Sequence, residues 1–272
     1  MVPAIELNNQ VQLPQVGFGV YKIPDDEVAQ AMRSAFDAGY RSVDTATLYE
    51  NERGVGEGVR SSGLPRDQLF ITTKLWNTDH GYDSALRAFD KSLGELGLDY
   101  VDLYLIHWPV PEQDLYVETW RALEKILADG RARAIGVSNF DEAQLLRLLD
   151  ETDVVPAVNQ VELHPWLQRA GLRGFHQRHG IVTEAWSPLA RGGELLAEET
   201  ITMIAGKHRK TPAQVVLRWH IEMDHVVIPK SVTQQRIAEN IAIFDFELDV
   251  HDIAAIAALE AGRRVGSRSR TS

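Results

Sequence analysis

Asp44-Thr45-Ala46-Thr47-Leu48-Tyr49, Ile71-Thr72-Thr73-Lys74, Leu105-Ile106-His107-Trp108 and Ile228-Pro229-Lys230-Ser231 are four short stretches that share one pattern. The first three place an ionisable residue at or just after the end of an apolar run typical of a β-strand. The fourth ends such a run with a cation and a hydroxyl. In a parallel α/β barrel all strands end on one face, so residues distant in sequence can meet there.

Apolar runs alternate with helix-like segments along the chain, which indicates a parallel sheet covered by helices. The runs are Val16–Tyr21, Arg41–Ala46, Leu69–Leu75, Val101–His107, Ala134–Ser138, Ala157–Leu163, Ile181–Ser187 and Val226–Lys230. Alternating residues around Asn8-Asn9 predict an N-terminal β-hairpin, and Asp141 with Gln144 predicts a capped helix start. Val250–Leu259 predicts an extra C-terminal helix. We therefore expect an α/β fold of the (β/α)8 TIM-barrel type, with a doubly wound parallel sheet as the alternative.

Composition restricts the class of protein. The chain has 272 residues, is 44% hydrophobic, carries a net charge of −11 and contains no cysteine. This argues against nucleic acid or an anionic membrane surface as the partner, and it excludes disulfides and a cysteine nucleophile. Neither a signal peptide nor an apolar run long enough to span a bilayer is visible. We expect a cytoplasmic monomer.

No linker or low-complexity tract divides the chain, so we expect residues 1–272 to form a single domain. Residues 263–272 are basic and carry Gly and Ser, which favours a flexible tail. The alternative is a flap that supplies an arginine to an anionic substrate.

Tyr49 is the candidate proton donor at the strand ends. A free tyrosine, with a pKa of about 10, is a poor acid near neutrality. The ammonium of Lys74 is expected to lower the pKa of Tyr49, Asp44 to balance Lys74, and His107 to hydrogen-bond a carbonyl oxygen. Each residue alone also has an ordinary structural explanation. Together, at three successive strand ends, they predict proton donation to a carbonyl that receives a hydride.

A second cluster follows the seventh and eighth strands, where barrels often bind phosphate. Ser187-Pro188-Leu189 follows the seventh strand, and Lys230-Ser231-Val232 follows the eighth. Arg236, Glu239 and Asn240 come next on a helix whose start favours an anion. Lysine and arginine together suit the additional phosphate of NADP. No glycine-rich Rossmann fingerprint and no metal-ligand set is evident.

Three ordered segments resemble the signatures of the aldo-keto reductase family. They are Gly39–Ala46 continuing through Tyr49 to Gly56, Ala134–Phe140, and Ile228–Ser231 continuing through Arg236 to Asn240. The similarity spans residues 5–259, and the chain resembles the bacterial 2,5-diketo-D-gluconate reductase-like subgroup. The resemblance implies a (β/α)8 barrel, NADPH as the cofactor, reduction of aldehydes, ketones or dicarbonyls, and Tyr49 as the acid assisted by Lys74, Asp44 and His107.

The resemblance also implies roles for other residues. The cofactor would contact Ser138, Asn139, Gln160, Trp186, Ser187, Leu189, Lys230, Ser231, Val232, Arg236, Glu239 and Asn240, with Trp186 stacked on the nicotinamide. The substrate would contact Tyr21, Leu48, Trp76, His107 and Trp108. Many relatives carry Trp where this chain has Tyr21, and the short C-terminus suggests an open pocket.

Two other functions remain as alternatives. A non-catalytic NADPH-binding sensor or regulatory subunit would use the same cofactor site without turnover. A Schiff-base lyase would use Lys74 as a nucleophile on a barrel strand.

Overall fold

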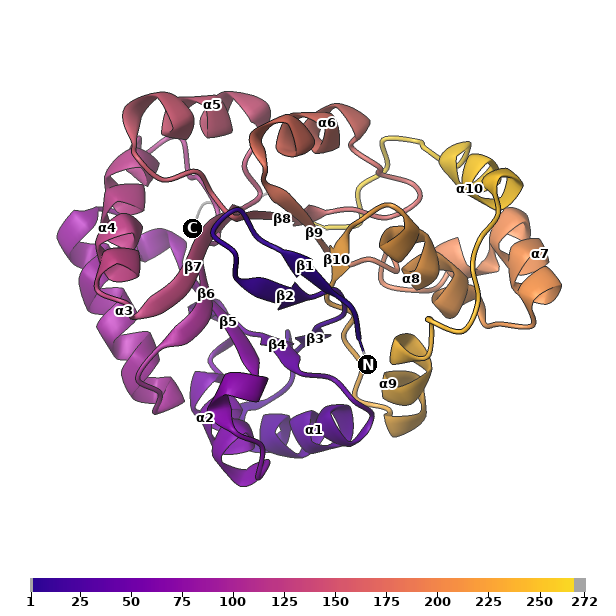
Figure 1. Ribbon diagram of the computed structural model, residues 1–272, viewed down its shortest axis with the longest axis horizontal. Helices are drawn as coiled ribbons and strands as arrows, with labels where there is room; N and C mark the ends of the chain where they lie inside the picture. Colours follow the sequence, from indigo (N-terminus) through magenta and orange to yellow (C-terminus); the bar gives the residue numbers. More distant parts are fainter. Residues whose placement is uncertain (1, 267–272) are drawn as a thin grey trace.

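The computed structural model describes residues 2–266 and contains a ring of eight parallel strands (Figure 1). The strands are β3 (Phe18–Gly19), β4 (Ser42–Asp44), β5 (Phe70–Leu75), β6 (Val101–Ile106), β7 (Ala132–Ser138), β8 (Val158–Glu162), β9 (Val182–Trp186) and β10 (Val226–Val227). They are hydrogen-bonded in sequence order. A parallel bridge between Val16 and Val227 joins the two ends of the sheet and closes the barrel. The expected (β/α)8 barrel is confirmed.

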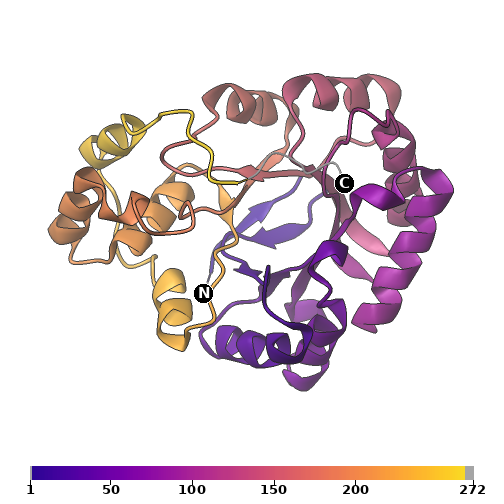
Figure 2. The same cartoon turned by 180° about the vertical axis from the view of Figure 1, so that it is seen from behind.

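Helices surround the strands on the outside of the barrel (Figures 1 and 2). They are α1 (Asp25–Asp37), α2 (Glu52–Ser61), α3 (Tyr82–Leu96), α4 (Tyr116–Ala128), α5 (Glu142–Glu151), α6 (Ala170–His179), α7 (Glu199–His208), α8 (Pro212–Glu222), α9 (Gln234–Ile241) and α10 (Val250–Ala257). Short 3-10 helices η1 (Thr47–Tyr49), η2 (Arg66–Gln68), η3 (Asn77–Asp79) and η4 (Leu195–Ala197) lie in the loops. The expected C-terminal helix is α10, and α7 is a further insertion before α8. None of the described helices is long and apolar enough to cross a membrane.

The N-terminal hairpin lies across one end of the barrel (Figure 1). Its antiparallel strands β1 (Ala4–Glu6) and β2 (Gln12–Pro14) pair Ile5 with Leu13. Leu7 and Leu13 are buried in a cluster with inward-facing residues of β5 to β10. The cluster partners are Phe70, Leu103, Leu105, Ala134, Val158 and Val226. The hairpin therefore seals the end at which the strands begin, and leaves the opposite end open to ligands.

The capping box predicted at the start of α5 is present. The Asp141 side chain accepts a hydrogen bond from the Gln144 amide, and the Gln144 side chain accepts one from the Asp141 amide. Such a box satisfies two donors that the helix cannot pair internally. The box fixes the start of α5, which follows the short loop after β7.

Side chains facing the barrel interior change character along each strand. On β9, Val182 packs in the apolar cluster below, whereas Glu184 and Trp186 lie further along the same face of the strand. The interior is thus apolar at the hairpin end and polar where the strands finish. The candidate site lies at that polar end.

Candidate active site

Four residues predicted to carry the chemistry meet at the carboxyl ends of β4, β5 and β6. Lys74 Nζ donates to Asp44 Oδ1 at 2.5 Å and to the carbonyl oxygen of Thr45 at 2.9 Å. It also lies 5.1 Å from the ring centroid of Tyr49. The rings of Tyr49 and His107 are 5.9 Å apart between centroids. The structure therefore brings Asp44, Lys74, Tyr49 and His107 together, and their roles remain a prediction.

The loop after β4 holds Tyr49 through a buried amide. Asn51 Nδ2 donates to the carbonyl oxygens of Val20 and Ile23 at 3.0 and 2.9 Å, while Asn51 Oδ1 accepts from Thr45 Oγ1 at 2.6 Å. Two of these hydrogen bonds attach the loop to the segment after β3, and the third, from Thr45, closes the loop on itself. Tyr49 lies between these anchors, at the end of η1.

Electrostatics at Tyr49 differ from the expectation drawn from its sequence neighbours. Burial raises the pKa of Tyr49 to about 12, although the charge of Lys74 works in the opposite direction. The prediction that Lys74 lowers the pKa of Tyr49 was right about the direction of that interaction and wrong about the net shift. The reason is that desolvation of the phenolate outweighs one ammonium.

Lys74 and His107 have opposite charge states. Burial alone lowers the pKa of Lys74, but Asp44 and the phenol of Tyr49 outweigh it, so the pKa is raised and the ammonium persists. Burial, reinforced by Lys74, lowers the pKa of His107 well below its usual value. His107 is therefore neutral, and its Nδ1 has no partner among the described residues. A neutral imidazole can donate one hydrogen bond to a carbonyl oxygen.

The residues expected to contact the nicotinamide lie on the three adjacent strand ends β7, β8 and β9. Trp186 Nε1 donates to Asn139 Oδ1 at 2.9 Å, and Asn139 Nδ2 donates to the His107 carbonyl oxygen at 3.0 Å. Ser138 Oγ donates to the carbonyl oxygen of Gln160 at 2.8 Å. The structure thus brings Ser138, Asn139, Gln160 and Trp186 together beside His107.

One buried acid in this region was missed from the sequence. Glu184 accepts a hydrogen bond from Gln160 Nε2 at 2.9 Å, and the same nitrogen donates to Asp44 Oδ2 at 2.8 Å. Glu184 is 1% exposed. The available signal was a carboxylate in the middle of a mainly apolar strand candidate, Ile181–Ser187.

Residues expected at the phosphates surround an exposed helix start. Lys230 and Arg236 are exposed, and within residues 2–266 neither forms an ion pair. Arg236 lies in the first turn of α9, Ser231 and Val232 precede that helix, and the second turn holds the half-buried Glu239 and the buried Asn240. Unpaired cations beside a helix N-terminus fit a phosphate group. The residues present therefore fit the phosphate end of NADPH.

The loop after β9 contains an unusual concentration of residues with positive φ angles. Ser187, Ala190 and Arg191 have φ angles of 50°, 48° and 64°, and two glycines with positive φ follow. The N–H groups of Ala190 and Gly192 are hydrogen-bonded within the loop, to the carbonyl oxygens of Ser187 and Leu189 at 2.8 and 2.7 Å. Leu189 lies half-buried in this loop and packs against the apolar core, and its contact with the cofactor remains a prediction.

Two buried histidines, His220 and His225, connect this loop to the protein interior through hydrogen bonds. Arg173 Nη1 lies 3.3 Å from His225 Nε2, His225 Nδ1 lies 3.2 Å from His220 Nδ1, and His220 Nε2 lies 3.2 Å from the Pro188 carbonyl oxygen. Arginine can only donate and a carbonyl oxygen can only accept. His225 therefore accepts from Arg173 and donates to His220, and His220 donates to the Pro188 carbonyl, so each histidine is neutral. Burial accordingly lowers the pKa of His220 to about 3.

The expected substrate residues form an aromatic rim. Tyr21 lies 5.0 Å from Tyr49 and Trp76 lies 5.1 Å from His107 between ring centroids. Tyr21 and Leu48 are exposed, and Trp76 and Trp108 are half-buried. This rim is open to solvent around the polar end of the barrel.

The C-terminal segment reaches the ends of β8 and β9, where it contacts Glu162 and Trp186. Glu162 Oε1 accepts from the backbone N–H groups of Val265 and Gly266 at 2.6 and 3.0 Å. Burial alone raises the pKa of Glu162, but these bonds and His164 outweigh it and lower the pKa. A Cβ at position 266 would lie 2.4 Å from Trp186, so only glycine fits against that ring. Residues 267–272 of the predicted tail lie outside the described residues.

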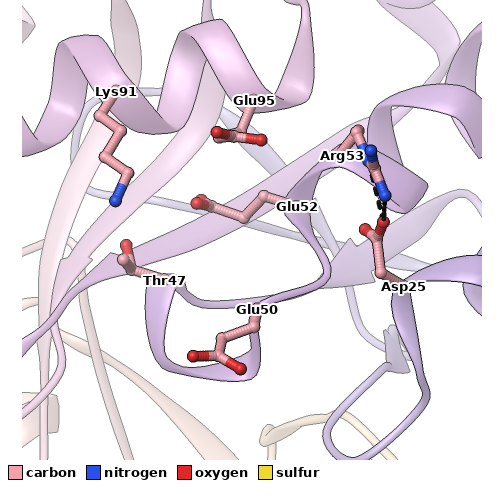
Figure 3. A pocket seen from close by; sticks show the side chains of 7 residues that line it. All are labelled: Asp25, Thr47, Glu50, Glu52, Arg53, Lys91 and Glu95. Carbon is pink, nitrogen blue, oxygen red and sulfur yellow. Dashed lines mark hydrogen bonds and ion pairs between the residues drawn. The ribbon is translucent and has the colours of Figure 1, made fainter.

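A separate cavity of about 270 Å³ lies outside the barrel, between the loop after β4 and helix α3 (Figure 3). It is lined by Asp25, Thr47, Glu50, Glu52, Arg53, Lys91 and Glu95. Glu52 is engaged there by Thr73 Oγ1 at 2.5 Å and Ser92 Oγ at 3.2 Å. The cavity is not the reaction site, because none of the four acid–base residues lines it.

Comparisons with known proteins agree with this geometry. The Aldo/keto reductase family model matches residues 15–261. Morphine 6-dehydrogenase of Pseudomonas putida is 51% identical, covering 98% of this chain and 95% of that protein. Methylglyoxal reductase DkgA of Salmonella typhimurium is 48% identical, covering 96% and 95%. A mutant of Gox0644 in complex with NADPH superposes with a TM-score of 0.93 at 48% identity, covering 99% of this chain and 97% of that one. The chain belongs to the Aldo/keto reductase family.

Proposed function

We propose that this chain is an NADPH-dependent oxidoreductase that reduces aldehydes, ketones and dicarbonyls to alcohols, with small α-dicarbonyls as its preferred class. The observation that carries the proposal is the contact of Asp44, Lys74, Tyr49 and His107 beside an open aromatic rim. Family membership, a relative named as a methylglyoxal reductase and a structural neighbour crystallised with NADPH support it.

The four residues divide the work of protonation. NADPH, when bound, supplies a hydride to the carbonyl carbon. Tyr49 gives its proton to the carbonyl oxygen, and its pKa of about 12 keeps that proton in place at neutral pH. The ammonium of Lys74, anchored by Asp44, stabilises the phenolate that remains. Neutral His107 donates a hydrogen bond that orients the oxygen toward Tyr49.

The cofactor is proposed to lie across the ends of β7 to β10. Ser138, Asn139 and Gln160 would hold its carboxamide, and Trp186 would stack on the ring. Ser187 and Leu189 would line the pyrophosphate. The adenosine end would contact Lys230, Ser231, Val232, Arg236, Glu239 and Asn240. The two unpaired cations in this set favour NADPH over NADH, because an arginine beside a phosphate forms charge-assisted hydrogen bonds.

The substrate is proposed to enter between Tyr21, Leu48, Trp76 and Trp108. An exposed aromatic rim contacts apolar groups without discriminating strongly among them. Relatives of similar identity are named for methylglyoxal and for morphine, so a shared family does not determine the substrate. Small dicarbonyls are proposed as the preferred class because a relative 48% identical to this chain is named as a methylglyoxal reductase, and an open rim does not exclude them.

A lysine nucleophile is disfavoured by the electrostatics. Schiff-base formation requires a neutral amine. The pKa of Lys74 is raised, and its ammonium is bonded to Asp44 and to a backbone carbonyl. The complete acid–base set likewise disfavours a non-catalytic sensor. The net charge of −11 disfavours a nucleic-acid partner, and we further propose that the protein acts as a cytoplasmic monomer.

The test is the consumption of NADPH and of NADH with methylglyoxal, small aldehydes and keto-sugars. We expect turnover with a preference for NADPH, and Arg236→Ala should weaken NADPH binding by about tenfold or more while leaving NADH nearly unchanged. Arg209→Ala, an exposed arginine at the end of α7, is the matched control. Equal use of both cofactors by the unmodified chain, or no turnover despite tight NADPH binding, would contradict the proposal.

A further inference from the structure

Glu184 is a buried carboxyl group to which the proposed proton transfer gives no role. It lies on β9, directly beside Gln160 of β8 in the register of the two strands. Its side chain points into the barrel and is 1% exposed. An acid so deeply buried is unfavourable unless its neighbours compensate for the lost water.

The contacts of Gln160 show what Glu184 contributes. Gln160 Nε2 donates to Glu184 Oε2 at 2.9 Å and to Asp44 Oδ2 at 2.8 Å. A primary amide nitrogen carries two hydrogens, so these two carboxyl groups use both. Only Oε1 of Gln160 is then left for a ligand, and that atom can only accept a hydrogen bond.

We propose that Glu184 is a positioning residue that, together with Asp44, fixes the amide of Gln160 so that its oxygen accepts a hydrogen bond from the carboxamide N–H of the bound cofactor. The inference rests on the proposed NADPH site. It concerns an amide that would otherwise be free to present either end, because its two orientations have nearly the same shape.

The charges around Glu184 make the burial of its carboxyl group detectable in the unliganded protein. Asp44 on β4 and Lys74 on β5 are the charged groups that act on it, while its neighbour on β10, Val226, is apolar. Burial and then Asp44 raise the pKa of Glu184 from 4.5 to about 7. Between these values the folded chain holds a proton that the unfolded chain has released. Glu184 therefore destabilises the fold as pH rises through this window.

Two substitutions separate the position of the carboxyl group from its charge. Glu184→Gln keeps an oxygen that accepts from Gln160 but removes the charge, whereas Glu184→Ala removes both. We expect Glu184→Ala to bind NADP⁺ about tenfold more weakly, the scale of one lost hydrogen bond, and Glu184→Gln to retain near-normal affinity. In the unliganded protein we compare the Tm of Glu184→Gln with that of the unmodified chain. The difference in Tm, variant minus unmodified, should be several degrees larger at pH 8.5 than at pH 5.

A cofactor analogue probes the amide directly. The 3-acetylpyridine analogue of NADP⁺ lacks the carboxamide N–H, so the unmodified chain should bind it more weakly than NADP⁺. In Glu184→Ala the difference in affinity between NADP⁺ and its 3-acetylpyridine analogue should be smaller. Glu52→Gln is the matched control, since Glu52 is also a buried acid with a raised pKa but does not contact Gln160. It should leave the discrimination between the two ligands unchanged.

The outcomes are distinct. If the unmodified chain binds no NADP⁺, the proposed function fails and the inference fails with it. If the unmodified chain binds NADP⁺ and Glu184→Ala binds it equally well, only the inference is overturned. Equal losses of affinity in Glu184→Ala and Glu184→Gln would also overturn it, because positioning by an uncharged acceptor predicts rescue by glutamine.

Discussion

The two ends of the barrel interior are built from the same strands but do different things. On β8, Val158 packs against the hairpin residues Leu7 and Leu13, while Gln160, two residues further along, is hydrogen-bonded to Asp44. One strand thus contributes an apolar side chain at one end and a polar one at the other.

The difference separates stability from chemistry within one fold. Buried apolar side chains at the hairpin end favour folding through the hydrophobic effect. Buried charges at the other end require precise pairing and contribute less to net stability than an apolar core of the same volume. Substitutions at the polar end should therefore affect both stability and turnover, whereas substitutions at the hairpin end should affect stability alone.

The largest effect is expected where a charge loses its partner. Lys74→Met leaves Asp44, which is 2% exposed, without its ammonium. We expect a loss of about 3–5 kcal/mol in the free energy of unfolding, because a buried carboxylate becomes uncompensated. Turnover should fall as well, because the phenolate of Tyr49 is no longer stabilised. Urea denaturation and steady-state kinetics measure the two effects.

Lys125→Met is the control for this experiment. Lys125 pairs with Asp129 on the surface, with side-chain exposures of 50% and 40%. Exposed pairs contribute about 0–1 kcal/mol, so this variant should be nearly neutral and fully active. Similar losses of stability in the two variants would show that the Asp44–Lys74 pair is not effectively buried.

A substitution at the hairpin end should lower stability without changing turnover. Leu13 is fully buried in the apolar cluster, and Leu13→Ala should cost about 2–5 kcal/mol of unfolding free energy because it opens a cavity. The variant should keep the kcat and KM of the unmodified chain at a temperature where it remains folded. A large fall in kcat would show that the two ends are coupled rather than separate.

A smaller effect is expected at the loop after β9. His220→Phe removes the hydrogen bond to the Pro188 carbonyl and should weaken NADPH binding about fivefold, the scale of one hydrogen bond, with little change in kcat. Titration of the cofactor by fluorescence measures the affinity. His179→Phe, on the exposed face of α6, should bind normally. Unchanged affinity in His220→Phe would mean that the loop does not need this anchor.

Much of the fold could be predicted because the barrel repeats a simple pattern. Each of the eight predicted apolar runs contains or overlaps an observed strand, since strands covered on both faces carry mainly apolar residues over much of their length. The capping residues located α5 because their hydrogen bonds are local. Helix α7 was not predicted, because it is a second helix between β9 and β10, packed against α8 and α10, and so lies outside the simple strand–helix alternation.

The site was predictable only in part. Residues at strand ends, such as Lys74, could be placed together because the barrel aligns those ends. Glu184 could not, because a sequence does not show which face of a strand turns inward or what lies opposite. The direction in which the pKa of Tyr49 shifts could not be predicted from the sequence either, since it depends on how much water the fold removes from the phenol.

Tyr49→Phe tests the central claim most directly, because it removes one hydroxyl from the polar end and leaves the ring in place. We predict that kcat for methylglyoxal reduction falls about 10²- to 10⁴-fold, the range contributed by a general acid, while NADPH still binds. Tyr82→Phe, on the outer helix α3, should behave as the unmodified chain. Retention of more than about a tenth of the turnover in Tyr49→Phe would contradict the assignment of Tyr49 as the acid.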